Sequence, residues 1–450
     1  MNKLIKYWGD LRSSFWFMPS FIVAAIMVFA VLLIEFDASI SQDWMVQWPR
    51  VFGVGADGAR AMLSTLAGSM MTVMSITFSM TLLALSLASG QYSSRVLRNF
   101  MRNPTTQLTL GVFAGIFAYC LIVLRTIRSG DGADEFVPSL AVFFAFLMSL
   151  GGIGVLIYFI HHIASSIQAT NIIASVAEET NASIDRLLPK HTADAANKTA
   201  GCHYQLDALD ERQWYAVAAA RSGYIQNVDI AELMWLAQAH KTIVRMEHGV
   251  GAFVVQGTPL VSLALTFAPE QCTVKALNAA YSIGRYRVLE LDPAFGIRQI
   301  VDIALKALSP GVNDTSTAVI CVDYLSSILA RLAGRKFPPV QHYADDTLRV
   351  IAVAPNFEGL LTEAFEQIRA SAENNIAILL RMLSGFTAIA SLTSKPSHIS
   401  ALDDQRRRIA ELVEPCFASS HDRALLKRRL LELSETLKTQ SSCSVAEEKG

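Results

Sequence analysis

Four long apolar segments, separated by polar stretches, occupy the first third of the chain. They carry no Asp, Glu, Lys or Arg, and they cover residues 15–34, 61–94, 104–124 and 136–160. A helix needs about 20 apolar residues to cross a bilayer, and each segment meets that length. The first is longer than the apolar stretch of a signal peptide and has no nearby cleavage site. The pattern therefore predicts four transmembrane helices, the first of them an anchor.

The second apolar segment places its small and hydroxyl residues on one helical face. At about 100° per residue they share an arc of about 80°. The face consists of Ser64, Gly68, Thr72, Ser75, Ser79 and Ser86. Such a face in a membrane helix packs tightly against a neighbour or lines a wet path. Tight packing is the preferred interpretation, and a path lined by hydroxyl groups is the alternative.

Glycines in the next two segments repeat this theme. Gly111 and Gly115 are spaced as a Gly-x-x-x-Gly pair, and Gly151, Gly152 and Gly154 are clustered. Glycine lets two helix backbones approach closely. We expect close helix contact at both places.

Basic residues flanking the segments predict the orientation of the chain. Lys3, Lys6 and Arg12 precede the first segment, whereas the loop that follows it is mainly acidic. Because cytoplasmic loops are enriched in Lys and Arg, the N-terminus should be cytoplasmic, and four spans return the chain to that side. We expect a multi-pass protein of the cell inner membrane with both termini in the cytoplasm.

Three arginines follow the second segment, at Arg95, Arg98 and Arg102. Apolar residues between them recur at helical spacing, which predicts an amphipathic turn at the inner leaflet with the arginines on lipid phosphates. The alternative is a ring that attracts anions at the mouth of an oligomeric pore.

The second half of the chain changes from apolar runs to a mixed pattern. Glycines and a proline punctuate β-branched pieces between residues 211 and 265, and amphipathic helical stretches follow residue 357. The expected fold is a mainly α membrane protein with four transmembrane helices and a cytoplasmic α+β half. That half combines a small β-barrel or sandwich with a helical bundle. The expected parts are a transmembrane domain (1–163), a helical connector and linker (164–200), a β-rich domain (201–288), a helical domain (289–440) and a disordered tail (441–450).

Two helix starts stand out in the second half. Asp292 before Pro293 is typical of an N-cap, and Asn313 or Asp314 should cap a helix that ends before Gly334. Polar residues at a helix start can also hold an anion or small ligand through free N–H groups. The candidate ligand turn consists of Arg298, Asn313, Asp314 and Thr315. Capping explains the same residues and is the preferred interpretation.

Composition excludes several classes of protein. Hydrophobic residues make up 52% of the chain, charged residues only 17%, and the formal net charge is −1. A nucleic-acid partner is therefore not expected. None of the six cysteines forms a Cys-x-x-Cys pair, so neither a disulfide framework nor a metal site is expected. We find no catalytic motif and expect neither an enzyme nor a cofactor.

Two stretches of the chain together resemble a known family. One is Gln91 to Phe100 with Gln107 to Gly111, and the other is Asp292 to Arg298 with Ala307 to Asp314. The chain resembles a bacterial family of predicted inner-membrane proteins that share a domain of unknown function, DUF2254. Ser94 and Thr315 to Thr317 depart from the family pattern, which has proline at the first position and Pro-Thr-Thr at the second. The resemblance implies location and architecture but no reaction.

Three classes of function remain. The first is an oligomeric, channel-like or passive transport protein with a cytoplasmic regulatory half. The second is a membrane-anchored sensor or scaffold that binds a cytoplasmic ligand or partner, and the third and weakest is a membrane-bound enzyme. No charged residue lies inside the four segments, which disfavours an ion-coupled pump. The expected partners are the lipid bilayer and further copies of the chain.

Overall fold

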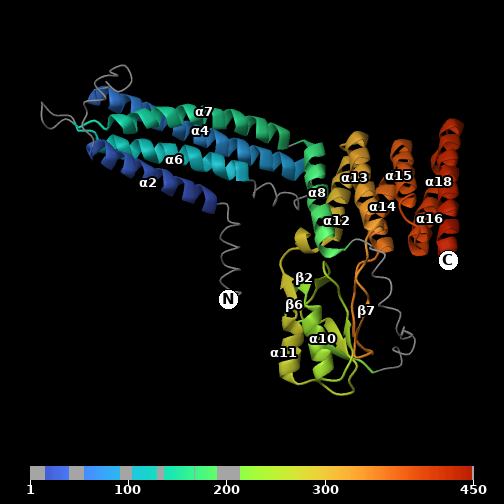
Figure 1. The fold of residues 1–450 in the computed structure, drawn as a ribbon. Helices are drawn as coiled ribbons and strands as arrows, with labels where there is room; N and C mark the ends of the chain where they lie inside the picture. The colour runs from blue at the N-terminus through green and yellow to red at the C-terminus, as the bar shows by residue number, and fades with distance from the viewer. Residues whose placement is uncertain are drawn as a thin grey trace. The chain divides into compact units, whose positions relative to one another are not determined.

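The computed structural model describes residues 16–39, 55–91, 104–128, 136–166, 168–189 and 213–447. The chain divides into two compact units, Met1–Asn171 and Ile172–Gly450 (Figure 1). Arg95, Arg98 and Arg102 lie outside the described residues, as do the basic residues before the first apolar segment. The expectations for them stay predictions.

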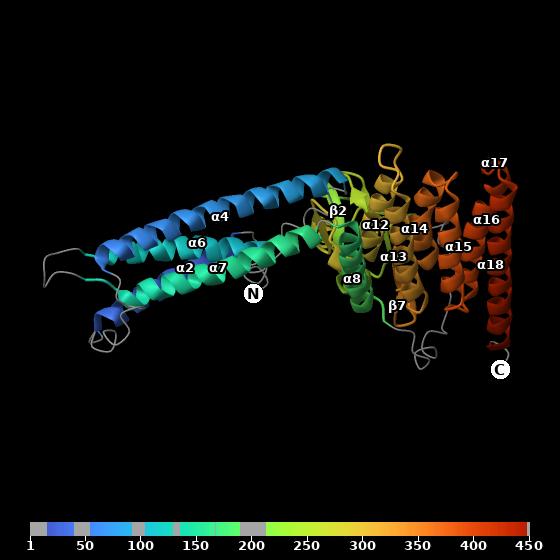
Figure 2. The same cartoon turned by 90° about the horizontal axis from the view of Figure 1, so that it is seen from above.

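The first unit consists, in its described part, of long apolar helices that lie side by side (Figures 1 and 2). They are α2 (Phe17–Ser39), α4 (Ala56–Gln91), α6 (Pro104–Thr126) and α7 (Ser139–Ser166). Helix α6 contacts the other three. Its buried side chains fill the centre of the unit with large apolar groups, which include Phe113, Ile116, Tyr119 and Val123. Apolar residues on several faces of one helix produce this central position.

The end of α2 differs from the sequence prediction. The helix continues to Ser39 and so includes Glu35 and Asp37, which we expected in a loop. Asp37 is only 6% exposed, and its carboxylate accepts the backbone N–H groups of Leu140 (3.0 Å) and Ala141 (3.3 Å). These groups open α7 and have no partner within their own helix. The helix therefore extends beyond the uncharged segment 15–34 and includes two acidic residues near its end.

Close helix contact at Gly111 and Gly115 is confirmed. A Cβ atom added at Gly111 would lie 3.0 Å from Cα of Pro19 in α2, and one added at Gly115 would overlap Ile26. In the fourth segment only Gly152 faces a neighbour, since its added Cβ would contact Ile116 at 3.4 Å. Cβ atoms at Gly151 and Gly154 would meet nothing within 4 Å, so the contact expected for these two glycines is not made within the chain.

The strand-containing part of the second unit has two sheets. The larger has the order β1-β5-β3-β8-β7 and the smaller the order β4-β2-β6. The strands are β1 (Tyr215–Ala218), β2 (Gly223–Val228), β3 (Val244–Met246), β4 (Phe253–Val254), β5 (Pro259–Leu263), β6 (Tyr281–Gly284), β7 (Gln341–Ala344) and β8 (Thr347–Ile351). Helices α10 (Ile230–Ala239) and α11 (Gln271–Ala279) complete a core that both sheets share.

Neither sheet closes on itself within the described residues, so the barrel that we considered is wrong. Strands β7 and β8 come from beyond residue 288, where we expected a helical domain. Leu348 and Val350 of β8 are fully buried, and Val350 joins the shared core. A strand with alternating buried residues completes a sheet wherever tertiary contact brings it, however distant it is in sequence.

Helices dominate the remaining described part of the second unit (Figures 1 and 2). They are α8 (Ala169–Leu187), the short 3-10 helix η3 (Leu289–Leu291), α12 (Pro293–Ala307), α13 (Thr315–Ala333), α14 (Phe357–Ser371), α15 (Ile376–Ala390), α16 (Pro396–Ala410), α17 (Val413–Cys416) and α18 (Ser420–Glu447). Helix α18 continues to Glu447, although we expected a disordered tail from residue 441. Its buried leucines at positions 426, 430, 433 and 437 recur at helical spacing and anchor the helix against its neighbours.

Helix α13 adds a fifth segment to the four expected. Five helices among the described residues are long and apolar enough to cross a membrane, and α13 is the fifth. It contacts α12, α14 and α15 within the second unit. Two of its charged side chains pair with other helices of this unit: Asp323 pairs with Arg381 of α15, and Arg331 pairs with Asp185 of α8.

Candidate functional site

The small-residue face of α4 lies on the surface of the first unit. All six of its residues are exposed: Ser64, Gly68, Thr72, Ser75, Ser79 and Ser86. The buried residues of α4 include Leu63, Ala67, Met70, Thr77 and Ala84. At about 100° per residue, these two sets lie on roughly opposite sides of the helix. The neighbour that the packing interpretation requires is therefore not one of the described helices of the same unit.

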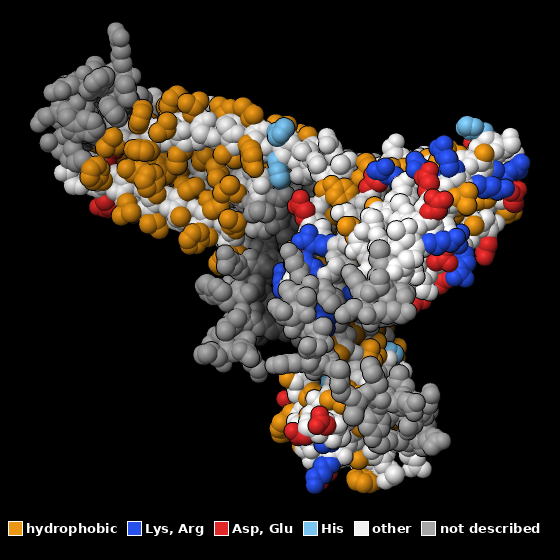
Figure 3. Space-filling model, turned by 45° about the vertical axis from the view of Figure 1, so that its right-hand side comes forward, with side chains coloured by type: hydrophobic (Ala, Val, Ile, Leu, Met, Phe, Trp, Pro, Cys, Tyr) orange, Lys and Arg blue, Asp and Glu red, His pale blue; other side chains and the backbone are white. Residues whose placement is uncertain are grey.

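Large apolar side chains flank the small-residue face on both sides. Met71 (44% exposed) and Phe78 (44%) lie on one side, and Ile76 (51%) and Leu83 (61%) lie on the other. Leu82 interrupts the face, as expected from the sequence. A Cβ atom added at Gly68 would meet nothing within 4 Å. The face is thus a shallow strip of small residues between two rows of larger, exposed apolar side chains. Side chains on the surface of the first unit that Figure 3 shows are likewise predominantly hydrophobic.

Hydroxyl groups along α4 donate to the backbone of their own helix. The hydroxyl of Thr72 donates to the carbonyl of Gly68 (3.0 Å), and that of Ser75 donates to the carbonyl of Met71 (3.0 Å). The only proton of each such hydroxyl is used in this hydrogen bond, and the oxygen keeps a lone pair that can accept another. The described hydroxyls of this kind therefore present acceptors, not donors, to whatever lies against the face.

The turn at Asn313 and Asp314 acts as a helix cap. The carboxylate of Asp314 accepts the backbone N–H (3.0 Å) and the hydroxyl (2.6 Å) of Thr317, and these bonds hold the pKa of Asp314 below its usual value. Asn313 adopts the left-handed region at φ 47°, which asparagine tolerates well. The Thr315 hydroxyl accepts from Asn375, the N-cap of α15. The predicted cap at Asp314 is confirmed.

Arg298 does not join this turn. It lies in the first half of α12, whereas the turn follows the C-terminal end of the same helix. Its guanidinium donates to Asp302 (2.9 Å) and lies 3.6 Å from Glu363 of α14. The structure therefore separates Arg298 from the other three residues of the candidate ligand turn, and sequence proximity alone could not show this.

Replacing Asp314 with alanine should destabilise the second unit by about 1 kcal/mol, the usual size of a lost N-cap. Hydrogen exchange of the first turn of α13 in the full chain would measure the change. The control is Glu435→Ala, at an exposed position within α18. Unchanged exchange in Asp314→Ala would contradict the capping role.

The segment from Asp292 to Arg298 is a structural junction, which the sequence indicated only in part. Asp292 caps α12, as predicted, by accepting the backbone N–H of Phe295 (3.2 Å). Its other oxygen accepts from Arg287 (2.7 Å), whose guanidinium lies 5.1 Å from the centre of the Phe295 ring. At Gly251, where φ is +88°, an added Cβ would lie 2.9 Å from Arg287. The junction thus joins the strand-containing part to the helices.

The next residue of this segment brings α8 into the junction. A Cβ atom added at Gly296 would overlap the hydroxyl of Thr180 in α8. Thr180 is fully buried, and its hydroxyl donates to the carbonyl of Val176 (2.6 Å). Close packing of the Thr180 side chain against the backbone of α12 explains the glycine without any ligand. Within the Asp292 to Arg298 stretch of the family resemblance, Asp292 and Gly296 are therefore accounted for by capping and packing.

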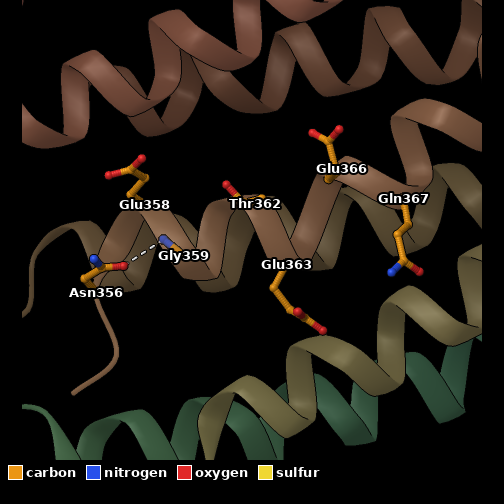
Figure 4. Close-up of a pocket in the computed structure, with 7 residues that line it drawn as sticks. All are labelled: Asn356, Glu358, Gly359, Thr362, Glu363, Glu366 and Gln367. Carbon is orange, nitrogen blue, oxygen red and sulfur yellow. Dashed lines mark hydrogen bonds between the residues drawn. The ribbon is translucent and has the colours of Figure 1, made fainter. Parts of the chain in front are cut away.

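A surface pocket of about 500 Å³, which sequence reasoning missed, lies along α14 (Figure 4). Its lining residues are Asn356, Glu358, Gly359, Thr362, Glu363, Glu366 and Gln367. Basic side chains already neutralise part of it: Glu363 lies near Arg298, and Glu366 pairs with Arg369 and Arg408. Burial raises the pKa of Glu366, but these two arginines outweigh burial and hold it below its usual value. The recurrence of glutamates at helical spacing was the sequence signal that could have indicated this pocket.

Comparison with known proteins gives one family. Residues 12–388 match the family model described as "Predicted membrane protein (DUF2254)". An uncharacterised protein of Mycobacterium bovis and one of Mycobacterium tuberculosis strain H37Rv are similar to the chain. Each is 31% identical over 422 residues, which cover 92% of this chain and 79% of the relative. No solved structure matches the chain significantly.

Proposed function

Because the chain belongs to the DUF2254 family of predicted membrane proteins, we propose that it is an oligomeric, channel-like protein of the cell inner membrane. In this proposal α4 lines a path for the passive movement of water or small cations, and the second unit is its cytoplasmic regulatory half. No catalytic step, cofactor or nucleic acid is assigned to it.

The proposed topology has four spans, α2, α4, α6 and α7. Helix α13 is left out because it packs among α12, α14 and α15, and because its charged residues pair with other helices of the second unit. The basic residues before α2 and after α4 favour the cytoplasm for these two flanks. Both termini are then cytoplasmic.

A reporter fused after Gly450 tests this topology. Green fluorescent protein should fluoresce there and alkaline phosphatase should be inactive, because the four-span arrangement leaves the C-terminus inside. The same two reporters fused in the loop near residue 132 should give the opposite pair of results. Active phosphatase at Gly450 would rule the four-span arrangement out.

The position of the small-residue face on α4 carries the functional proposal. The small residues leave a shallow strip with acceptor oxygens, and a protein partner or water covers such a strip better than lipid tails do. The centre of a single unit is filled by buried side chains such as Phe113 and Tyr119, so a path through one copy has no room. A path between copies, with α4 from each copy facing its axis, uses the exposed face and leaves the core intact.

The chemistry of this face suits passive flow. None of the six residues is charged, so a permeating cation meets no strong trap. Hydroxyl oxygens can replace part of the hydration shell of an ion. Because the described Thr72 and Ser75 hydroxyls donate to their own helix, their oxygens offer acceptors, which favour cations over anions.

Conductance of the purified full chain in planar bilayers is the direct test. We expect discrete, cation-selective currents, together with a homo-oligomer by native mass spectrometry of the protein in detergent. A stable oligomer without conductance would overturn the channel and favour the sensor or scaffold, with the face used for packing between copies. A monomer would overturn the oligomeric part of the proposal.

A further inference from the structure

The small sheet has an outer surface that its own core does not use. Ile225, Val254 and Ile283 point inward and are buried. On the opposite side, Tyr224 pairs in register with Phe253 on one neighbouring strand and with Gly284 on the other. Side chains of directly opposed residues share a face of a sheet, so Tyr224 and Phe253 lie together on the outside.

Exposed aromatic and aliphatic side chains gather on this outer surface. Phe253 is 54% exposed, Val255 51% and Tyr286 50%. The rings of Tyr224 and Phe253 contact each other edge to face, with centroids 5.0 Å apart. Val255 directly follows β4 (Phe253–Val254), and continuing the alternation of the strand by one residue places it on the same side as Phe253. We call Tyr224, Phe253, Val255 and Tyr286 the aromatic face.

The backbone holds the aromatic face in place. The side-chain amide of Gln226 donates to the carbonyl of Tyr286 (2.8 Å) across the sheet. The Gln226 side chain can pass over residue 284 because that residue is glycine. A Cβ atom added there would overlap the Gln226 amide. Tyr286 therefore follows β6 in a fixed position.

Basic side chains border the aromatic face. Arg285 is exposed, and its guanidinium lies 5.7 Å from the centre of the Tyr286 ring. Arg221, also exposed, precedes β2 by two residues. The two residues assigned to this border are thus both basic. An exposed apolar surface with a polar rim marks an interaction site, and this rim is positive.

We propose that the aromatic face docks on the anionic surface of the bilayer that holds α2, α4, α6 and α7. Tyrosine and phenylalanine suit the boundary between headgroups and acyl chains, and arginine pairs with lipid phosphates. Helix α7 ends at Ser166 and α8 begins at Ala169, so the second unit is tethered within a few residues of a membrane helix. Tethering raises the effective concentration of the lipid surface, and a weak attraction is then sufficient.

This docking does not depend on conduction by α4. It requires only that the second unit be joined to membrane helices, and it gives that unit a contact whose strength follows the content of anionic lipid. A change in lipid composition would then alter the freedom of the strand-containing part.

The test uses the full chain in lipid nanodiscs, with a nitroxide label introduced by Val255→Cys. The nitroxide reagent would also react with native thiols. The background chain therefore carries serine at Cys202, Cys272, Cys416 and Cys443. Collision of the label with oxygen, which enters lipid, is compared with collision with a water-soluble nickel complex. The matched control is Gln238→Cys on α10, which is exposed but lies outside the aromatic face.

In nanodiscs that contain phosphatidylglycerol, we expect the ratio of oxygen to nickel collisions at position 255 to rise severalfold over that at position 238. The rise should shrink in pure phosphatidylcholine and in the double variant Arg221→Gln/Arg285→Gln. An equal ratio at both positions in both lipids would overturn the proposal. Loss of both collisions regardless of lipid would also overturn it and would indicate a protein partner on the aromatic face.

Discussion

Cysteines introduced by Ser75→Cys and Ser79→Cys are expected to react with small water-soluble thiol reagents in the membrane-embedded protein. The proposed path exposes these positions to water, although the helix around them is apolar. Reaction should also reduce conductance to near the level of a protein-free bilayer, because every copy in the oligomer would place a bulky group in the same path.

The matched controls are Val73→Cys and Met80→Cys on the same helix. Val73 is partly buried in the first unit, and Met80 is exposed well away from the small-residue face. Both should remain unreactive, since they contact neighbouring helices or lipid. If all four positions are unreactive and Ser79→Leu destroys the oligomer, α4 uses its small residues for packing between copies, and the channel proposal fails.

Acid should destabilise the second unit between about pH 6.5 and pH 4 through His398 of α16. Burial, and to a smaller extent the nearby positive charge of Lys395, lower the pKa of this histidine to about 4. The ring is 5% exposed, stacks on Phe357 with centroids 4.1 Å apart, and bonds to the Thr393 hydroxyl through Nδ1 (3.0 Å). This site holds a neutral ring and excludes a charged one.

The direction of the pH effect follows from the two pKa values. The unfolded chain binds a proton on His398 below about pH 6.5, whereas the folded chain does so only below about pH 4. The stabilisation is therefore complete above about pH 6.5 and is lost as the pH falls to about 4. The full loss amounts to at most about 3 kcal/mol.

Hydrogen exchange of α16 in the full chain, followed from pH 7 to pH 4, measures this loss. Carboxyl groups also titrate in this range, so the relevant quantity is the difference between the native chain and His398→Gln. The variant should be less stable at pH 7 and should lose less stability on acidification. His421→Gln, at an exposed position in α18, is the control and should follow the native chain. Equal slopes for the native chain and His398→Gln would contradict the prediction.

The helices and their caps were predictable from local spacing. The apolar segments, the caps at Asp292 and Asp314, and the close contact at Gly111 and Gly115 all depend on neighbours a few residues apart or on one intrinsic property of glycine. A side chain that caps its own helix needs no information from distant parts of the chain. The family resemblance in the sequence was likewise carried by short segments, and the family match agrees with it.

Features that join distant segments were not predictable in this way. Asp37 caps α7 from about a hundred positions away, and β8 completes a sheet begun before residue 220. Arg298 is close in sequence to the turn at Asp314, yet it faces α14 because α12 directs it there. These contacts form because particular faces of two distant elements pack against each other. A single sequence does not indicate which faces pack together.

The small-residue face of α4 shows this division most clearly. The amino-acid sequence by itself determined that Ser64, Thr72, Ser75 and Ser79 lie on one side of a membrane helix, because helical periodicity fixes their directions relative to one another. Only the tertiary structure decided that this side points outward. Larger residues on the other side, such as Leu63 and Met70, fill the space against the neighbouring helices, and their packing turns the face away from the core.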